Sequence, residues 1–364
     1  MSQLDVTEPI ADIESLRLLK YRELLRITAL DVAQVIPYVD ILLALSTLAD
    51  YILRKALAII SNTSDMQWHG KRLPFALFSL GKLGAQELNY SSDVDLIFVC
   101  ANAEDIDGDM YAYYALLVKM IQRFIRQMEE KHSCGYLYRV DLNLRPLGKS
   151  APLVLPLDDT ENYYTVSSDV WERFAWLRAR CIVGAEPLGN EMSARLHAYK
   201  YRKFLEPSDI DRFISIKEAM QVQRNKSGAW NVKTGEGGIR DIEFFIQVLQ
   251  IANAGFHPIL QQTNTMTLLH NMVNLGLVDA IVAKSIQHSY LFLRRLENHL
   301  QMVDEAQVSD LPEELEARLM IAKSIGFTVG NVEQILKEFN QELQQSRDIA
   351  LACFDKVLLK KSEH

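Results

Sequence analysis

Apolar residues recur at helical spacing through the first part of the chain, over residues 15–57. The pattern begins with Leu16, Leu19, Leu24 and Ile27, which fall on one broad face of a helix with about 3.6 residues per turn. Pro37 interrupts the pattern and predicts a break, because proline cannot continue a helix. We therefore expect two or three helices in this region.

Two apolar runs then predict buried strands, over residues 74–80 and 93–100. An acidic loop over residues 102–109 separates the second strand from a helical pattern at 111–131, and residues 136–144 alternate in polarity as a strand does. These elements predict a small mixed sheet flanked by helices.

Strand signals become scarce beyond about residue 163, and helical patterns replace them. Four segments carry the helical period: residues 210–223, 240–254, 266–275 and 277–303. We expect a second half that is entirely helical. The expected domains are N-terminal helices over residues 1–62, a catalytic domain over 63–200 and a helical bundle over 201–364.

Composition narrows the class of protein. The chain has 364 residues, 49% of them hydrophobic, which is enough to bury a sizeable core. Its formal net charge of −8 argues against a broad nucleic-acid surface, which would be basic. The four cysteines are far apart and form no CxxC pair, so neither a disulfide framework nor a zinc site is indicated.

The location of the protein is predicted from what the sequence lacks. The acidic start of the chain has no basic region followed by an apolar core. No segment has the length and apolarity needed to cross a bilayer. We expect a cytoplasmic protein whose cysteines are buried thiols, with no membrane partner.

Two carboxylates enter the strand predicted at 93–100. Asp93 and Asp95 are two positions apart, so in a strand they point to the same face. Gly81 and Gly84 lie a dozen residues upstream, and glycines let backbone N–H groups approach phosphates closely. Asp141 follows another strand-like segment and completes a set of three if the two strands are neighbours.

This combination indicates nucleotidyl transfer. Carboxylates are hard oxygen ligands of the kind Mg²⁺ prefers, and two such ions can stabilise the attacking and leaving oxygens of an in-line phosphoryl displacement. The alternative is structural: Asp141 caps a turn and Asp95 pairs with an arginine. No Ser/His/Asp or Cys/His arrangement suggests covalent catalysis.

Motifs along the chain resemble those of glutamine synthetase adenylyltransferases, over roughly residues 16–306. In chain order they are Gly81-Lys82-Leu83-Gly84, Glu87-Leu88-Asn89, Ser91-Ser92-Asp93-Val94-Asp95-Leu96-Ile97-Phe98, Arg139-Val140-Asp141, Leu144-Arg145-Pro146, Trp171-Glu172-Arg173, Arg178-Ala179-Arg180 and Gly237-Gly238-Ile239-Arg240-Asp241-Ile242-Glu243-Phe244. The resemblance implies an α+β fold: the mixed sheet and flanking helices of a polymerase β-like nucleotidyltransferase, followed by an all-helical bundle.

The resemblance also implies the reaction and its partners. One half of these bifunctional enzymes attaches AMP to a tyrosine of glutamine synthetase, and the other removes it by phosphorolysis, giving ADP. Asn89, Arg240 and the segment 291–298 make this chain similar to the amino-terminal, adenylyl-removing half. Glutamine synthetase is the expected protein substrate, with ATP, ADP and phosphate as substrates or products. A separate chain carrying the other catalytic half is a further expected partner.

The resemblance assigns roles to individual residues. Asp93, Asp95 and Asp141 are the implied catalytic residues and the ligands of Mg²⁺, with two ions expected. The resemblance implies that Gly81, Lys82 and Ser92 contact phosphate or nucleotide. Further candidates for such contacts are Gly84, Arg145, Arg178, Lys233 and Arg240.

Two sets of residues also have purely structural explanations. Arg173, Arg178 and Arg180 suit phosphate, but arginines on helices also form solvated ion pairs with acids such as Glu172. The segment 233–240 contains three glycines and precedes a helix; it suits either a phosphate cradle or a plain helix-entry turn.

Some positions depart from the family pattern. Ala85 stands where a second glycine is usual, and a Cβ would strain a backbone with positive φ. Asn143 stands where an arginine is usual, and asparagine supplies no charged fork for phosphate. The second catalytic half of full-length members is absent, so we expect a truncated, split or divergent member.

Three functions stay open at this point. The first is phosphorolytic removal of AMP from glutamine synthetase. The second is the reverse direction, ATP-dependent addition of AMP to the same tyrosine, which the same site could serve. The third is a catalytically weakened docking or regulatory module, motivated by Ala85, Asn143 and the missing half. An RNA or small-molecule nucleotidyltransferase is a remoter alternative.

Overall fold

The computed structural model describes residues 10–202, 212, 215, 229–302 and 307–359. The chain divides into two compact units. Unit 1 comprises residues 1–29, 40–88 and 92–200, and unit 2 comprises residues 30–39, 89–91 and 201–364. Unit 1 therefore contains most of both the expected N-terminal helices and the expected catalytic segment, while two short pieces of the first half belong to unit 2.

Two long helices precede the sheet, as the apolar pattern predicted. Helix α1 spans Ile13–Val32 and helix α2 spans Tyr38–Ser61, and Pro37 lies between them. A small hairpin of strands β1 (Gln67–Trp68) and β2 (Lys71–Arg72) follows. Both helices begin and end close to the predicted limits.

A mixed sheet lies at the centre of unit 1. Strand β3 (Phe75–Ser79) pairs antiparallel with β4 (Val94–Cys100) and with β7 (Arg180–Val183). Two short strands, β5 (Val140–Asp141) and β6 (Val154–Pro156), pair parallel with β4. The prediction of a mixed sheet flanked by helices is confirmed.

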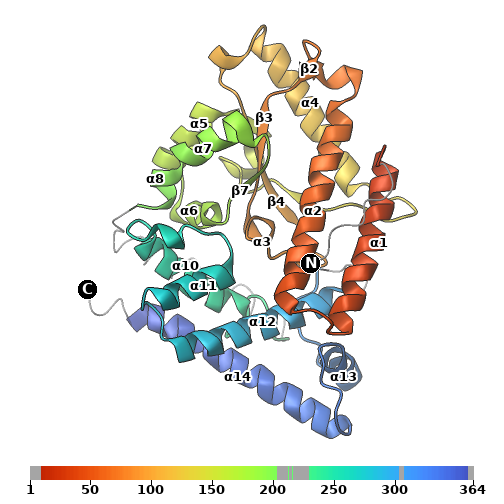
Figure 1. The fold of residues 1–364 in the computed structure, drawn as a ribbon, viewed down its shortest axis with the longest axis vertical. Helices are drawn as coiled ribbons and strands as arrows, with labels where there is room; N and C mark the ends of the chain where they lie inside the picture. The colour runs from red at the N-terminus through yellow and green to blue at the C-terminus, as the bar shows by residue number, and fades with distance from the viewer. Residues whose placement is uncertain (1–9, 203–211, 213–214, 216–228, 303–306, 360–364) are drawn as a thin grey trace. The chain divides into compact units, whose positions relative to one another are not determined.

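Helices cover both faces of this sheet (Figure 1). Helix α4 (Met110–Glu129) packs on one face, where the rings of Phe98 and Phe124 are 6.0 Å apart. On the other face, Phe78 and Ile97 pack against Trp176, Tyr164 and their neighbours. These come from the helices α5 (Leu157–Asn162), α6 (Val170–Leu177), α7 (Asn190–Arg195) and α8 (His197–Lys200) and from the π-helical turns Tyr163–Ser167 and Ala185–Gly189.

The strand predictions were incomplete and in one place wrong. Strands β1, β2, β6 and β7 were not predicted, because each has only two to four residues, too few for an alternating pattern. The strand expected over 136–144 is limited to Val140 and Asp141. Upstream of it, the N–H groups of Leu137 and Tyr138 donate to the Met128 carbonyl at the end of α4 instead of to another strand.

Unit 2 is helical within its described residues, apart from an isolated bridge between Asn231 and Asp310. Its helices are α10 (Ile239–Asn253), α11 (Thr265–Asn274), α12 (Ala280–Met302), α13 (Leu315–Ser324) and α14 (Val332–Leu359). Three of these match predicted segments. The helix expected over 210–223 falls almost wholly outside the described residues.

A buried polar cluster joins distant segments within unit 2. Asn89 accepts from Arg294 Nη2 at 2.8 Å and donates to Glu297 Oε2 at 2.8 Å. The Tyr90 N–H donates to Asn298 Oδ1 at 2.9 Å, and the Tyr90 hydroxyl donates to Asp31 at 3.2 Å. We call these six residues the α12 cluster. Its ion pairs and hydrogen bonds hold residues 89–90 and Asp31 on helix α12.

No helix within the described ranges combines the length and apolarity that crossing a bilayer requires.

The remaining helical elements are short. They are α3 (Gly81–Gly84) and the 3₁₀ helices Ser64–Met66, Ala103–Asp105, Gly148–Ser150 and Pro258–Leu260.

Candidate functional site

Two of the predicted carboxylates lie on neighbouring strands in matching register. Strand β4 pairs parallel with β5, with Val94 opposite Val140 and Asp95 opposite Asp141. Residues opposite each other in a sheet project to the same face. The sheet therefore brings Asp95 and Asp141 together, although 46 positions separate them in the sequence.

The turn after β3 packs directly on Asp95. The Leu80 N–H donates to the Asp95 carbonyl at 2.9 Å. Gly81 has φ +55°, and a Cβ on it would lie 2.2 Å from Asp95 Oδ2. Only glycine permits both this left-handed backbone and this close approach. The glycine turn and the carboxylate pair thus form one local structure.

Asp93 is held differently from Asp95. It lies immediately before β4, and its Oδ1 accepts a charge-assisted hydrogen bond from Arg139 Nε at 2.7 Å. The ion pair is partly exposed, with side-chain exposures of 32% for Arg139 and 37% for Asp93. Arg139 was not among the predicted site residues. The signal that could have found it is its position two residues before Asp141, in the same motif.

Asp141 also has a local partner. Its Oδ1 accepts from the Asn143 N–H at 2.7 Å, the turn contact that was the structural alternative for this residue. The Asn143 side chain is exposed. The position at which the family usually has arginine therefore lies on the surface, two residues from Asp141.

Arg145 organises the loop that follows β5. Its guanidinium group donates to four backbone carbonyls, those of Leu142, Lys149, Ala151 and Pro152. Only 8% of Arg145 is exposed. Burial lowers its pKa, and the charge of Asp141 acts in the opposite direction. Most of its donors are used within the loop, so its predicted contact with a nucleotide stays a prediction.

Gly84 and Arg178 meet through the backbone. A Cβ on Gly84 would lie 1.9 Å from the Arg178 carbonyl oxygen, so the end of α6 packs against the α3 turn at a glycine. Lys82 lies within α3 and is half-buried. Ser92 directly precedes Asp93 and is also half-buried.

Ala85 is compatible with its position. It has φ −76° and ψ −6°, an ordinary right-handed conformation, and the residue that follows it, Gln86, has a positive φ of +60°. The strain considered for a Cβ at Ala85 is therefore absent.

The arginines around α6 are engaged inside unit 1. Arg180 forms a bidentate ion pair with Asp50, with N–O distances of 2.7 and 2.9 Å, and also donates to the Leu83 carbonyl in α3. Arg173 is buried and donates to the Lys200 carbonyl at 3.3 Å. Glu172 accepts from Tyr163 and from the Asp169 N–H. Arg180 thus stabilises the α3 turn.

The glycine-bearing segment 233–240 lies in unit 2 and enters helix α10. Its N–H groups are used internally: Gly237 donates to Asp241 Oδ2 at 2.9 Å, Ile239 to the Val232 carbonyl and Arg240 to the Lys233 carbonyl. These contacts favour a helix-entry turn over a backbone cradle for phosphate. Roles for the Lys233 and Arg240 side chains stay predictions.

The three carboxylates predicted to bind metal do not form a three-residue cluster in the described residues. Within the ranges that the structure describes, no three His, Cys, Asp or Glu side chains are arranged to hold a metal ion. Arg139 and the Asn143 N–H occupy oxygens of Asp93 and Asp141. The adjacent carboxylates of Asp95 and Asp141 nevertheless fit Mg²⁺, which proteins often bind with one or two carboxylates and substrate phosphates.

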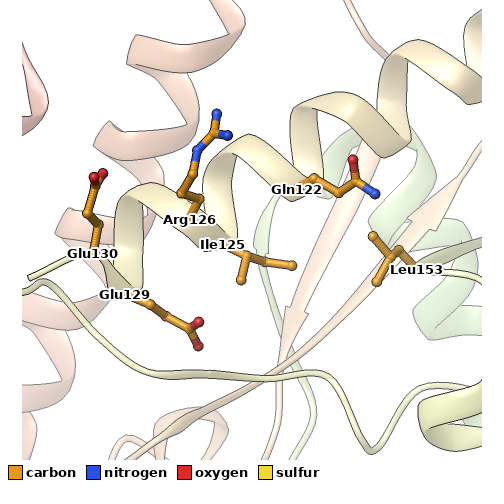
Figure 2. Close-up of a pocket in the computed structure, with 6 residues that line it drawn as sticks. All are labelled: Gln122, Ile125, Arg126, Glu129, Glu130 and Leu153. Carbon is orange, nitrogen blue, oxygen red and sulfur yellow. The ribbon is translucent and has the colours of Figure 1, made fainter.

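A surface pocket of about 640 Å³ lies elsewhere in unit 1, along the last turns of α4. Its lining includes Arg126, Glu129 and Leu153, and Figure 2 shows Arg126 and Glu129 pointing to opposite sides of the helix. None of the predicted site residues lines it. The pocket therefore does not coincide with the predicted carboxylate site.

This α+β fold, with its mixed sheet, flanking helices and paired carboxylates beside a glycine turn, is of the nucleotidyltransferase type. Residues 4–195 match the family model described as glutamate-ammonia ligase adenylyltransferase. Because this match covers more than half of the chain, the chain belongs to that family. Residues 212–358 match a second model, described as PII-uridylyltransferase.

Individual relatives agree with this assignment. The chain is 35% identical over 328 residues to a bifunctional glutamine synthetase adenylyltransferase/adenylyl-removing enzyme of Thioalkalivibrio sulfidiphilus, and 32% identical over 321 residues to one of Hahella chejuensis. Each alignment covers 86% of this chain and 33% of the relative. The chain thus spans about a third of the length of these relatives.

Proposed function

We propose that unit 1 is a Mg²⁺-dependent nucleotidyl-transfer site that removes AMP from an adenylylated tyrosine of glutamine synthetase by phosphorolysis. The observation that carries the proposal is the packing of Gly81 on Asp95, with Asp141 in register beside it. The names of the relatives, which include adenylyl removal from glutamine synthetase, support the substrate.

In this reaction an oxygen of inorganic phosphate attacks the phosphorus of the AMP–tyrosine phosphodiester. The bond from phosphorus to the tyrosine oxygen breaks, ADP forms, and the released phenolate takes up a proton. A bound Mg²⁺ would neutralise phosphate charge and orient the two oxygens. No nucleophile from the protein is needed.

The residues of this chain supply position and charge. Asp95 and Asp141 would hold the ion from adjacent strands. Asp93 would be a further ligand, and Arg139 would fix the orientation of its carboxylate. Gly81, Lys82, Gly84 and Ser92 would contact phosphate or nucleotide from the α3 turn and the start of β4. Arg145, which stabilises the loop after β5, and Arg178, whose backbone packs on Gly84, would supply further contacts to the nucleotide.

The test is ADP release from AMP-modified glutamine synthetase incubated with the chain, Mg²⁺ and phosphate. Asp95→Asn keeps the shape of the side chain and removes its charge, and we expect it to lower the rate on the order of 100-fold or more, since several kcal/mol of charge stabilisation depend on the ligand. Asp105→Asn, at an exposed acid in a short 3₁₀ helix, is the matched control. Wild-type protein that binds the modified synthetase and releases no ADP would refute the proposal.

The reverse reaction is the second candidate, because the relatives are named for both activities. It predicts ATP-dependent labelling of unmodified glutamine synthetase by the same site, by microscopic reversibility. Assays in both directions with one preparation separate the two candidates, and inactivity in both would leave a docking module as the function.

A further inference from the structure

A lysine is buried inside a cage of three tyrosines in unit 1. Lys20, on helix α1, is 1% exposed. Its ammonium nitrogen lies 4.5 Å from the ring centre of Tyr21, 4.6 Å from that of Tyr136 and 5.2 Å from that of Tyr138. It also donates to the Tyr136 carbonyl at 3.2 Å. Burying an ammonium group is costly unless such partners compensate it.

The cage fixes the segment that leads to β5. The Tyr21 hydroxyl accepts from the Tyr136 N–H and donates to the Tyr136 carbonyl, both at 3.3 Å. Gly135, with φ +88°, lets this hydroxyl approach, since a Cβ there would lie 2.2 Å from it. Helix α1 thus holds Tyr136 by its backbone and by its ring.

Tyr136 in turn holds the arginine that binds Asp93. The Arg139 Nη1 donates to the Tyr136 hydroxyl at 2.5 Å, and the guanidinium carbon lies 5.6 Å from the centre of the same ring. The Nε of Arg139 donates to Asp93 Oδ1 at 2.7 Å. A continuous series of contacts therefore runs from Lys20 through Tyr136 and Arg139 to Asp93.

We propose that Lys20 and Tyr136 are positioning residues for the carboxylate site. They fix the guanidinium plane of Arg139, which sets the orientation of the Asp93 carboxylate. The role rests on the proposed function of that site. Loss of an outer contact to a metal-binding group typically lowers metal affinity or activity by about 10- to 100-fold, and the same size of effect is expected here.

The informative variant is Tyr136→Phe in the full chain. It removes the hydroxyl that Arg139 contacts and keeps the ring and the backbone carbonyl that Lys20 contacts. Tyr111→Phe makes the same chemical change at a side chain that is 88% exposed, and is the matched control. Lys20→Met removes the first contact of the series; where it fails to fold, Tyr136→Phe still decides the question.

Two measurements are independent of turnover. Binding of Mn²⁺ alone, followed by electron paramagnetic resonance, should weaken roughly 10-fold in Tyr136→Phe and not in Tyr111→Phe. Proton exchange at the Arg139 Nε–H, followed by NMR and assigned by its loss in Arg139→Lys, should accelerate in Tyr136→Phe. The turnover number for ADP release should fall by about the same factor as Mn²⁺ affinity, with KM for the modified synthetase unchanged.

The outcomes separate the two proposals. An active wild type whose Arg139 signal, Mn²⁺ affinity and turnover are all unaltered by Tyr136→Phe overturns the positioning role alone. A changed Arg139 signal with unaltered Mn²⁺ affinity and turnover also overturns it, because the contact is then structural only. A wild type that neither binds Mn²⁺ nor releases ADP overturns the proposed function, whatever the NMR signal does.

Discussion

At the scale of single residues, Gly81 combines a left-handed backbone conformation with close packing against Asp95. A Gly81→Ala substitution would place a Cβ 2.2 Å from Asp95 Oδ2 and force a non-glycine residue to φ +55°. We expect the loss of stability from the left-handed backbone, about 1–2 kcal/mol, together with a fall in ADP release on the order of 100-fold as Asp95 is displaced.

Gly70→Ala is the control for this prediction. Gly70 has φ +72°, and a Cβ there would meet nothing within 4 Å. Both variants place a non-glycine residue at positive φ, and only Gly81→Ala also brings a Cβ against Asp95. Equal losses of activity in both, measured beside urea unfolding, would show that the Gly81 contact has no part in the site.

Residue identity predicted the carboxylates but not their partners. The sequence indicates the three acids because they lie at predicted strands, downstream of a glycine-bearing turn. They are Asp93, Asp95 and Asp141. The Arg139–Asp93 ion pair and the four carbonyl contacts of Arg145 depend on loop conformations that no local pattern encodes. A guanidinium group suits phosphate and backbone carbonyls equally, so the sequence could not separate the two uses.

At the scale of elements, the capping box of α6 carries a pH dependence. Glu172 accepts from the Asp169 N–H, and its burial raises the pKa of the carboxyl group above its ordinary value. A raised folded-state pKa gives a contribution to stability that is present below the unfolded pKa of about 4.3 and is lost as pH rises through the folded value. Wild-type stability relative to Glu172→Gln should therefore decline across this range.

Urea unfolding at a series of pH values from about 4 to 7 measures this difference. Glu104→Gln, at an exposed acid, provides the reference for a surface substitution. A gap between wild type and Glu172→Gln that grows in favour of wild type as pH rises would contradict the stated cause.

A second prediction at this scale concerns the link between β7 and α2. The bidentate pair of Arg180 and Asp50 is largely buried, with side-chain exposures of 23% and 8%. A double-mutant cycle with Arg180→Met and Asp50→Asn should give a coupling energy of about 1–2 kcal/mol in unfolding. The pair of Asp50 with the exposed Arg54, at 3.6 Å, should give less than about 0.5 kcal/mol. Equal couplings would contradict the role of arginine burial.

The elements themselves were predictable where periodicity is long. Helices α2, α4, α10 and α12 and strands β3 and β4 follow extended apolar patterns. Strand β7 does not: Arg180 and Cys181 begin it, and its extended form is stabilised by pairing with β3. Strand β5 is short because the residues before it bond to the end of α4 and to α1.

At the scale of the whole molecule, the division into compact units does not follow chain order. Residues 30–39 and 89–91 belong to unit 2 with residues 201–364, and the α12 cluster connects the three segments. Arg294 and Glu297 have no exposed surface, and their contacts include Asn89. The domain boundaries predicted at residues 62 and 200 came from local patterns along the chain, in which these long-range polar contacts leave no mark.

A fragment of residues 201–364 would therefore lack the partners of its own buried charges. Removing one partner of a buried ionic network typically costs about 3–5 kcal/mol, a large part of the stability of an ordinary domain. We expect this fragment to show no cooperative thermal transition by circular dichroism, while the full chain unfolds cooperatively.

A point variant tests the same contacts within the full chain. Asn89→Ala should lower the free energy of unfolding by roughly 2–4 kcal/mol, since it removes one hydrogen-bond partner from each of Arg294 and Glu297. Asn143→Ala, which changes an exposed side chain, should have little effect. A fragment that unfolds cooperatively, with Asn89→Ala no more costly than Asn143→Ala, would mean that the helical part is stabilised without the segment that precedes Asp93.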